Sequence, residues 1–265
     1  MKGRWKRYYN NDFIMIILSL AAVVIIWELL VYLFRIPQWI LPPPNAILTE
    51  MFRSAGYLCQ HSLVTLGEVL IGFGLALTVG MFLGSIIAFF PLLEKTLYKL
   101  LVISQSIPKI AIAPMLVIWL GLGLLSKVAM AFFMCFFPVV VSTVSGLQST
   151  SRELLELADV MGANWYQSFL KIRFPAALPY LFSGLKISAS MAVIGAVISE
   201  FVNADKGLGY SLLMTTSQLN GPLTFSAVAM LALFGIGLFS LVTLAERLIC
   251  PWAKPIKILD RTERS

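Results

Sequence analysis

Few residues in this chain of 265 could carry out acid–base, nucleophilic or metal chemistry. His61 is the only histidine, so neither a histidine-based metal site nor a Ser-His-Asp triad is expected. The three cysteines, Cys59, Cys135 and Cys250, are far apart and form no C-x-x-C pair, which argues against a disulfide framework or a zinc site. The pattern G-x-x-x-x-G-K-[ST], which binds the phosphates of ATP, is also absent from the sequence. We therefore predict no catalytic, metal-binding or cofactor-binding residues.

The composition indicates where such a chain can reside. Apolar residues make up 59% of it and charged residues 12%, and the mean hydropathy is +0.88. Its 13 acidic residues cannot solvate the surface of a soluble protein of this length, so most of the surface must face lipid or other protein. The net charge of +7 comes from basic residues beside apolar runs, so a lipid bilayer rather than nucleic acid is the expected partner. These features predict an all-α integral membrane protein.

Six apolar stretches are long enough to predict about six transmembrane helices in a single domain, 1–265. Pro108 and Pro114 interrupt the third stretch, which we expect to lie beside other helices or a cavity. The basic segment 1–12 is expected to precede a retained first span rather than a cleaved signal. The predicted spans are 13–34, 63–90, 100–122, 128–146, 176–201 and 223–246.

Ionisable residues within these spans are costly, by roughly 2.5–3.5 kcal/mol each at the bilayer centre, and usually face an interior or a cavity. Glu28 fits a packing or interfacial role, and Glu68 could reach water at the outer end of its span. Lys109, between two prolines, is a candidate for a pore-facing or partner-paired role, whereas Lys186 could reach back to the cytoplasm. Lys186 and Glu200 stand about 21 Å apart along one helix, so their partners must come from other helices.

Basic residues predict the orientation of the six spans. With the amino terminus inside, the inner segments hold 14 Lys and Arg residues and the outer segments hold four. Those four are Arg35, Arg53, Lys127 and Lys206, and His61 is likewise expected in an outer loop, as an interfacial residue. Because inner loops are enriched in Lys and Arg, both the 1–12 segment and the 250–265 tail are predicted to be cytoplasmic.

One long inner segment, 147–175, differs in composition from its surroundings. Thr150 and Glu153 form a predicted capping box, followed by apolar residues at helical spacing. Gly162 is a predicted helix stop, and Asn164 is a predicted cap for a second short helix that Pro175 ends. We expect two amphipathic helices whose apolar face is held by the membrane domain. The acidic residues Glu153, Glu156 and Asp159 would then be available to a partner, although a helix lying passively in the interface is an alternative.

The spacing within this loop resembles that of permease subunits of bacterial ATP-binding-cassette importers. Their loop carries EAA, three residues, Gly, nine residues, Ile, one residue and Leu-Pro. Here Glu156, Leu157 and Ala158 are followed at that spacing by Gly162 and then by Ile172, Phe174 and Pro175. Leu157 and Phe174 depart from the pattern but remain apolar. The resemblance implies a type I importer permease fold, and an ATPase-coupling role for Glu153, Glu156, Ala158, Asp159, Gly162, Ile172 and Pro175.

Other segments extend the resemblance to the branch of this family that imports sulfonates, taurine, nitrate and precursors of thiamine or riboflavin. They are LPPPNAI at 41–47, SIPKIAIAPMLVIWLGLGLLSK at 106–127, CFFPVVVSTVSGL at 135–147 and GLGY at 207–210. Glu200 also fits this branch, whereas Glu68 departs from it. The resemblance implies a translocation path lined by Ser106, Pro108, Lys109, Pro114, Lys186 and Glu200, and a face toward a solute-binding protein at Gly207, Gly209 and Tyr210.

The implied function is a non-enzymatic transport subunit in the bacterial inner membrane. It would act as a homodimer, or as one half of a heterodimer, with an ATPase dimer that binds ATP and magnesium and an extracytoplasmic binding protein. The 153–175 element would move as ATP closes the ATPase pair, switching the spans between inward-open and outward-open states. Heteroaromatic vitamin precursors fit slightly better than sulfonates as substrates. The alternatives are an ion-coupled secondary transporter and a membrane enzyme acting on lipid.

Overall fold

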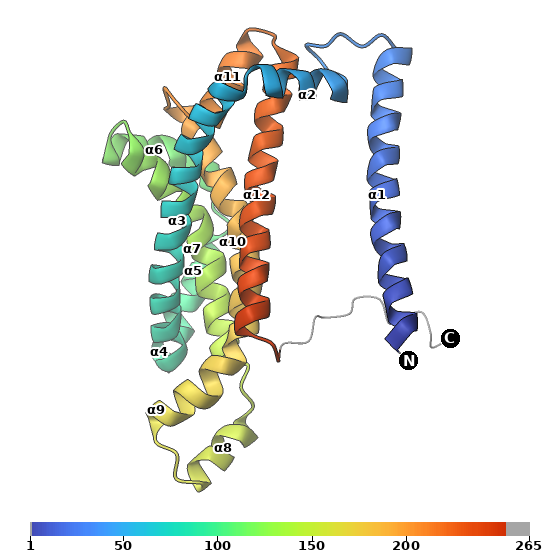
Figure 1. Cartoon of the computed structure of the whole chain (residues 1–265). Coiled ribbons are helices and arrows are strands. Elements are labelled where there is room, and N and C mark those ends of the chain that lie inside the picture. The colour runs from blue at the N-terminus through green and yellow to red at the C-terminus, as the bar shows by residue number, and fades with distance from the viewer. Residues whose placement is uncertain (1, 253–265) are drawn as a thin grey trace.

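The computed structural model describes residues 2–252, and for residues 2–13, 16 and 17 it gives the backbone alone. Helices joined by short turns build this part of the chain, which confirms the predicted all-α class (Figure 1). We call the two ends of the bundle the α8 end and the α11 end, after the helices found there. The α-helices are α1 (Lys2–Leu33), α2 (Pro44–Arg53), α3 (Ala55–Phe89), α4 (Pro91–Leu93), α5 (Lys99–Ser104), α6 (Ala113–Leu120), α7 (Leu124–Gln148), α8 (Arg152–Val160), α9 (Trp165–Ser168), α10 (Phe174–Val202), α11 (Leu208–Ser217) and α12 (Gly221–Ile249), and the irregular turns are η1 (Glu94–Tyr98), η2 (Lys109–Ile112) and η3 (Phe169–Arg173).

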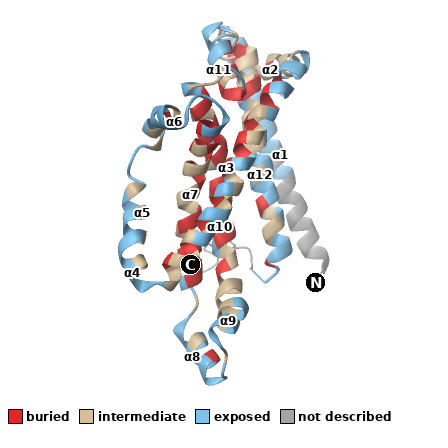
Figure 2. Cartoon of the chain, turned by 90° about the vertical axis from the view of Figure 1, so that its left-hand side faces the viewer, coloured by how far each residue is buried: buried red, intermediate tan, exposed pale blue. Residues whose placement is uncertain are grey.

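The core lies where α7 packs between α3 and α10, and α12 covers α10. Buried residues follow α7 and α10 along most of their lengths (Figure 2). Small residues bring these helices close together, including Ala131, Ala192 and Ala196, each with no exposed surface. Two reciprocal hydrogen bonds also join α7 to α10: the Cys135 thiol donates to the Ser188 carbonyl at 3.2 Å, and the Ser188 hydroxyl donates to the Cys135 carbonyl at 3.1 Å.

Glycines on one face of α3 set its close approach to α7. A methyl group added at Gly72 would lie 2.6 Å from the Ala131 side chain, and similar additions at Gly80 and Gly84 would meet α7 side chains at 2.8 and 2.7 Å. Gly74 lies on another face, where an added methyl group would meet nothing within 4 Å. Gly72, Gly80 and Gly84 therefore face α7, whereas Gly74 does not.

Within the described part of the chain, four helices are long and apolar enough to cross a membrane: α3, α7, the continuous helix Trp165–Val202 and α12. The pair Pro91–Ser104 and Lys109–Leu120 adds a fifth span if the two bent parts are counted together. In α1 the apolar stretch is shorter, Leu18–Leu33. The structure thus supports a multi-span membrane protein. By length and hydropathy, the described residues provide four spans, or five with the bent pair, rather than the predicted six.

The third predicted span, 100–122, is not a straight helix. The helix axis turns by 89° between α5 and the segment that begins at Lys109. Pro108 has an extended backbone here, with φ −60° and ψ 100°, and directly precedes the 3-10 turn η2. A proline lacks the N–H that a helix interior requires, which explains why the break falls at this position.

The helices outside the core differ in how much of their surface they bury. The side chains of helix α1 from Leu18 to Leu33 are mostly exposed. Helix α1 contacts α2, which crosses the α11 end toward α3 (Figure 1), and its Trp27 ring lies 6.2 Å from the ring of Phe225 on α12. At the opposite end, α8 and α9 project beyond the bundle (Figure 1). Helix α1 begins, and α12 ends, at the α8 end, and residues 253–265 of the predicted cytoplasmic tail lie outside the described part of the chain.

Candidate functional site

The projecting element begins at Ser151, the residue that caps α8. The Ser151 hydroxyl accepts a hydrogen bond from the Leu154 N–H at 3.4 Å. The predicted cap, Thr150, is therefore wrong by one residue, because Ser151 has the extended backbone that precedes a helix. The Thr150 hydroxyl is instead buried, with no hydrogen-bond partner among the described residues.

Both faces of α8 are exposed. The acidic residues Glu153, Glu156 and Asp159 are on the surface, as predicted. The apolar face is also on the surface: Leu157 is 55% exposed and Met161 is 78% exposed, and only Ala158 is buried. The expectation that the membrane domain of the same chain holds this apolar face is wrong, because α8 projects past the bundle and has no extensive contact with its long helices (Figure 2). An exposed apolar face with acidic neighbours is typical of a docking surface.

A glycine elbow separates α8 from α9, as predicted. Gly162 has φ +75°, a backbone conformation that residues with a Cβ rarely adopt, and its N–H donates to the Asp159 carbonyl at 2.9 Å. Helix α9 then begins after Asn164, which confirms the predicted cap. The Asn164 side chain accepts from the Gln167 N–H at 2.8 Å, and the Gln167 side chain accepts from the Asn164 N–H at 3.1 Å.

Aromatic packing joins α9 to the end of α3. The ring of Phe89 lies 5.3 Å from both Trp165 and Phe169, measured between ring centroids. Trp165 and Phe169 stack on each other at 5.8 Å, and the Arg173 guanidinium lies 5.8 Å from the centre of the Phe89 ring. Such contacts fix side chains in specific orientations. The α9 segment is therefore held against α3, while α8 is free on its surface.

The helix continues through Pro175, where the sequence predicted its end. Residues Trp165–Val202 form one continuous 38-residue helix that includes α9, η3 and α10. Pro175 occupies the first turn of α10, directly after the π-helical turn η3, which contains Ile172. A local change of helical pitch accommodates the missing N–H of the proline. The predicted coupling loop is thus continuous with a membrane-spanning helix.

The broken third segment presents its predicted path residues outward. Ser106, Pro108 and Pro114 are exposed, and Lys109 is half-buried. The Lys109 ammonium group lies 4.8 Å from the centre of the Phe137 ring on α7, so this lysine has a cation–π partner within the chain. The segment therefore offers a polar, irregular backbone to whatever lies beside the bundle.

Lys186 pairs with Glu246 across α10 and α12. The Lys186 ammonium group donates to the Glu246 carboxylate at 2.5 Å, and the two side chains are 24% and 19% exposed. As predicted, the partner comes from another helix. Lys186 therefore connects two helices near the α8 end.

Glu200 is enclosed at the far end of α10. The residue is 1% exposed, and its carboxylate accepts hydrogen bonds from the Thr65 hydroxyl on α3 at 2.7 Å and from the Gly209 N–H at 2.5 Å. Gly207 and Gly209 are buried against it, so these two predicted binding-protein-facing residues lie beneath the surface of this chain. Glu200, a predicted path residue, contacts the Gly207–Gly209 turn directly.

His61 belongs to this same cluster. The expected outer loop is wrong, because His61 lies within α3 and is 7% exposed. Its Nδ1 accepts a hydrogen bond from the Gly207 N–H at 3.0 Å, and the next N–H, that of Leu208, donates to the Thr65 hydroxyl at 2.8 Å. Tyr210 stacks on the His61 ring at a centroid distance of 5.9 Å.

A buried ion pair lies beside the cluster. The Lys127 ammonium group on α7 is 3.3 Å from a Glu68 carboxylate oxygen on α3, and both side chains are almost completely buried. Two expectations are corrected here: Glu68 does not reach water, and Lys127 is not an outer-loop residue. Each charge lies beside its counter-ion inside the bundle, but neither Glu68 carboxylate oxygen has a hydrogen-bond partner among the described residues.

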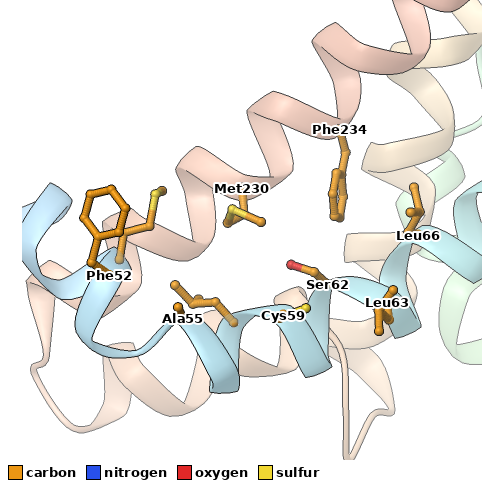
Figure 3. Close-up of a pocket in the computed structure, with 10 residues that line it drawn as sticks. Phe52, Ala55, Cys59, Ser62, Leu63, Leu66, Met230 and Phe234 are labelled. Carbon is orange, nitrogen blue, oxygen red and sulfur yellow. The ribbon is translucent and has the colours of Figure 1, made fainter.

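An apolar pocket of about 360 Å³ lies apart from these groups, between α2, α3 and α12. Figure 3 shows Met230 and Phe234 of α12 facing Ser62 of α3 across it. The Ser62 hydroxyl points into the pocket and has no hydrogen-bond partner among the described residues. No residue predicted to act in transport lines this pocket.

The buried cluster had a detectable signal in the sequence. His61, Thr65 and Glu68 are spaced by four and three residues, which places three polar side chains on one face of a helix. Neither the outer-loop expectation for His61 nor the expectation that Glu68 reaches water involves Thr65. Their partners on α7, α10 and α11 are distant in sequence, so only the fold identifies them.

Comparison with known proteins shows what kind of protein has this arrangement. Residues 76–254 match the model of the family described as "Binding-protein-dependent transport system inner membrane component". The chain belongs to this family. It is therefore a permease subunit of an ATP-binding-cassette importer, a multi-pass inner-membrane protein and not an enzyme, and a separate ATPase subunit hydrolyses ATP.

Relatives of this permease cover most of both chains. A probable ABC transporter permease of Haemophilus influenzae is 36% identical, over 88% of this chain and 96% of the relative. The formylaminopyrimidine transport permease ThiX of Halalkalibacterium halodurans is 35% identical, over 89% and 95%. The riboflavin transport permease RibX of Chloroflexus aurantiacus is 38% identical, over 88% and 88%. These matches favour the importer over the ion-coupled alternative, and the family implies an ATPase and a solute-binding protein as partners.

Proposed function

We propose that this permease imports a small heteroaromatic vitamin precursor, of the formylaminopyrimidine or riboflavin class. The observation that supports this proposal is the similarity to two permeases named for such solutes, at 35% and 38% identity. Sulfonates, taurine and nitrate are the other solutes that the sequence resemblance allows. The solute-binding protein delivers the solute, so its ligand identifies the substrate.

Helix α8 with its glycine elbow is the proposed docking element for the ATPase. An isolated nine-residue helix with Leu157 and Met161 on its surface leaves apolar area in water, which a partner can cover. The acidic residues Glu153, Glu156 and Asp159 add charge at the same surface, and Ala158 and Gly162 shape the turn of the chain. Ile172 and Pro175 lie where this element joins α10. Movement of the ATPase pair would thereby displace a membrane-spanning helix directly.

The α8 end is the proposed cytoplasmic side, with both chain termini on that side. The distribution of Lys and Arg supports this orientation, because the predicted outer segments hold only Arg35, Arg53 and Lys206 once the buried Lys127 is removed from the original four. The α11 end then faces outward. Tyr210 and the exposed residues Asp205 and Lys206 beside it are the proposed contact region for the solute-binding protein.

The translocation path is proposed to lie between two copies of this chain. The broken third segment supports this arrangement, since irregular backbone at membrane depth requires other protein or a water-filled cavity beside it. Ser106, Pro108, Lys109 and Pro114 are its proposed lining residues. Lys186 and Glu200 were predicted on the same path. Each of them, however, bonds to a residue of another helix, which favours a role in holding helices together.

Pulldown of the tagged, detergent-solubilised chain from its native membrane, with mass spectrometry of the co-purifying proteins, tests the assembly. Recovery of one ATPase, one binding protein and a single kind of permease chain is the expected result. The recovered binding protein is then titrated with formylaminopyrimidine, riboflavin and taurine. Binding of taurine alone would contradict the proposed substrate class while leaving the permease function intact.

A further inference from the structure

We propose that His61, Thr65 and Glu200 form a clasp that fixes the start of α11 to α3 and α10, so that α11 moves with the ATPase-driven helix α10. The proposal rests on the proposed ATPase docking at α8 and binding-protein contact at the α11 end. These three side chains are positioning residues, because they act through α11. Their role is to transmit the presence of the binding protein to the ATPase.

The clasp holds three consecutive backbone N–H groups. The amides of Gly207, Leu208 and Gly209 donate to His61, Thr65 and Glu200 respectively, at distances of 3.0, 2.8 and 2.5 Å. A helix leaves its first N–H groups without partners in its own backbone, and a capping side chain from the same segment commonly satisfies one of them. Here the start of α11 has no side-chain cap of its own. Two other helices, α3 and α10, supply the acceptors, so α11 cannot shift without breaking bonds to both.

This arrangement explains why glycine occupies positions 207 and 209 of the turn. Gly207 has φ +115°, and a methyl group added to it would collide with the Glu200 carboxylate. A methyl group added at Gly209 would lie 2.7 Å from a Glu200 carboxylate oxygen and 3.0 Å from the Val197 carbonyl. Glu200 therefore occupies the space that side chains at either position would need. The glycines of the G-L-G sequence in this turn therefore leave room for the Glu200 carboxylate.

A single helix connects the clasp to the ATPase side. The 38-residue helix Trp165–Val202 is about 57 Å long at 1.5 Å per residue. Its first turn packs on Phe89 next to the glycine elbow, and Glu200 lies two residues before its last residue. Both ends of the rigid element therefore carry a contact to α3. Displacement at α9 reaches α11 only if the Glu200 end of the helix holds the turn firmly.

The surroundings keep the clasp dry. Thr65 and Glu200 are at most 1% exposed, and the Glu68–Lys127 ion pair lies along the same face of α3. Water cannot readily replace the acceptors in this environment, so loss of one side chain leaves an N–H group without a partner. These buried hydrogen bonds therefore add to the packing that links α10 to α11.

The test uses the complex of this chain with its co-purified ATPase and binding protein, reconstituted in nanodiscs. Glu200→Ala and Thr65→Val remove acceptors, whereas Glu200→Gln keeps an oxygen for the Gly209 N–H and can donate its amide to the Thr65 hydroxyl. Glu50→Ala is the matched control, since among the described residues the side chain of this acidic residue of α2 accepts a single, local bond, from Ser54. Three quantities are measured: hydrogen exchange of the 207–209 amides, basal ATPase rate, and ATPase rate with the binding protein.

In Glu200→Ala and Thr65→Val we expect the 207–209 amides to exchange about tenfold faster. Stimulation of the ATPase by the binding protein should fall to near one-fold, while the basal rate stays within about twofold of the parent. Glu200→Gln and Glu50→Ala should retain stimulation. If Glu200→Ala fails to insert, Thr65→Val gives the result alone.

Three results would overturn the clasp: full stimulation despite accelerated exchange, a parallel loss of basal and stimulated rates, or unchanged exchange in both variants. Failure of the proposed function looks different, since the parent chain would then carry no ATPase activity that responds to a binding protein.

Discussion

The Lys127 ammonium group lies 3.3 Å from the Glu68 carboxylate, in the interior of the bundle between α7 and α3. Removing one partner leaves an unpaired buried charge, whereas removing both does not. Lys127→Ala or Glu68→Ala alone should therefore lower the free energy of unfolding by about 3–5 kcal/mol. The double variant should lose clearly less than the sum of the two losses. Thermal unfolding of the detergent-solubilised chain measures these differences, and additive losses would show that the two charges do not stabilise each other.

Glycine packing between α3 and α7 offers a matched pair of substitutions. Gly72→Ala should destabilise the chain by about 1–3 kcal/mol, because the new methyl group meets the Ala131 side chain and the Phe132 backbone, which cannot move aside. Gly74→Ala, two residues away on an open face, should be neutral or stabilising by up to about 1 kcal/mol through helix propensity alone. Unfolding midpoints distinguish the two variants. Equal effects would contradict the interface described for α3.

The glycine elbow can be tested through its backbone. Gly162→Val should reduce uptake by tenfold or more, because a left-handed backbone costs a β-branched residue at least about 1–2 kcal/mol and the elbow would change direction. Gly162→Asn should keep most uptake, since Asn tolerates this conformation. No atom lies within 4 Å of an added methyl group, so packing does not confuse the comparison. Normal uptake by Gly162→Val, with equal amounts of protein in the membrane, would remove the elbow from the coupling mechanism.

The Lys186–Glu246 pair between α10 and α12 should respond to charge reversal. Lys186→Glu alone places two acidic groups together and should lower stability by about 1–3 kcal/mol. The double reversal, Lys186→Glu with Glu246→Lys, should recover most of that loss. Thermal unfolding and uptake are measured together. A double variant that is stable but inactive would indicate that Lys186 also contacts the solute, as the family resemblance implies.

The membrane-spanning fold could be predicted from the sequence because hydropathy and proline positions depend on local composition. The break beside Pro108, the Gly162 elbow and the Asn164 cap are local features of this kind. Pro175 was misread because a proline in the first turn of a helix and a proline after a helix look the same in sequence. The π-helical turn that makes the helix continuous there has no clear sequence pattern.

The buried polar cluster could be predicted only in part. His61 and Glu68 looked like residues near the membrane surface because each lies close to the end of an apolar stretch. Their actual partners, Gly207 and Lys127, are brought to them by helix packing, and no local pattern specifies that pairing. The exposed apolar face of α8 was missed for a related reason, since periodicity identifies an apolar face but not the partner that covers it.

Solute transport by this chain is proposed to be driven by an ATPase docked at α8. The most direct measurement is uptake of the binding protein's ligand into proteoliposomes that contain the chain, its co-purified ATPase and the binding protein. Uptake should require ATP, persist when proton and sodium gradients are collapsed, and be lost with Gly162→Val. Uptake that follows an ion gradient and proceeds without any ATPase would contradict ATPase-driven transport.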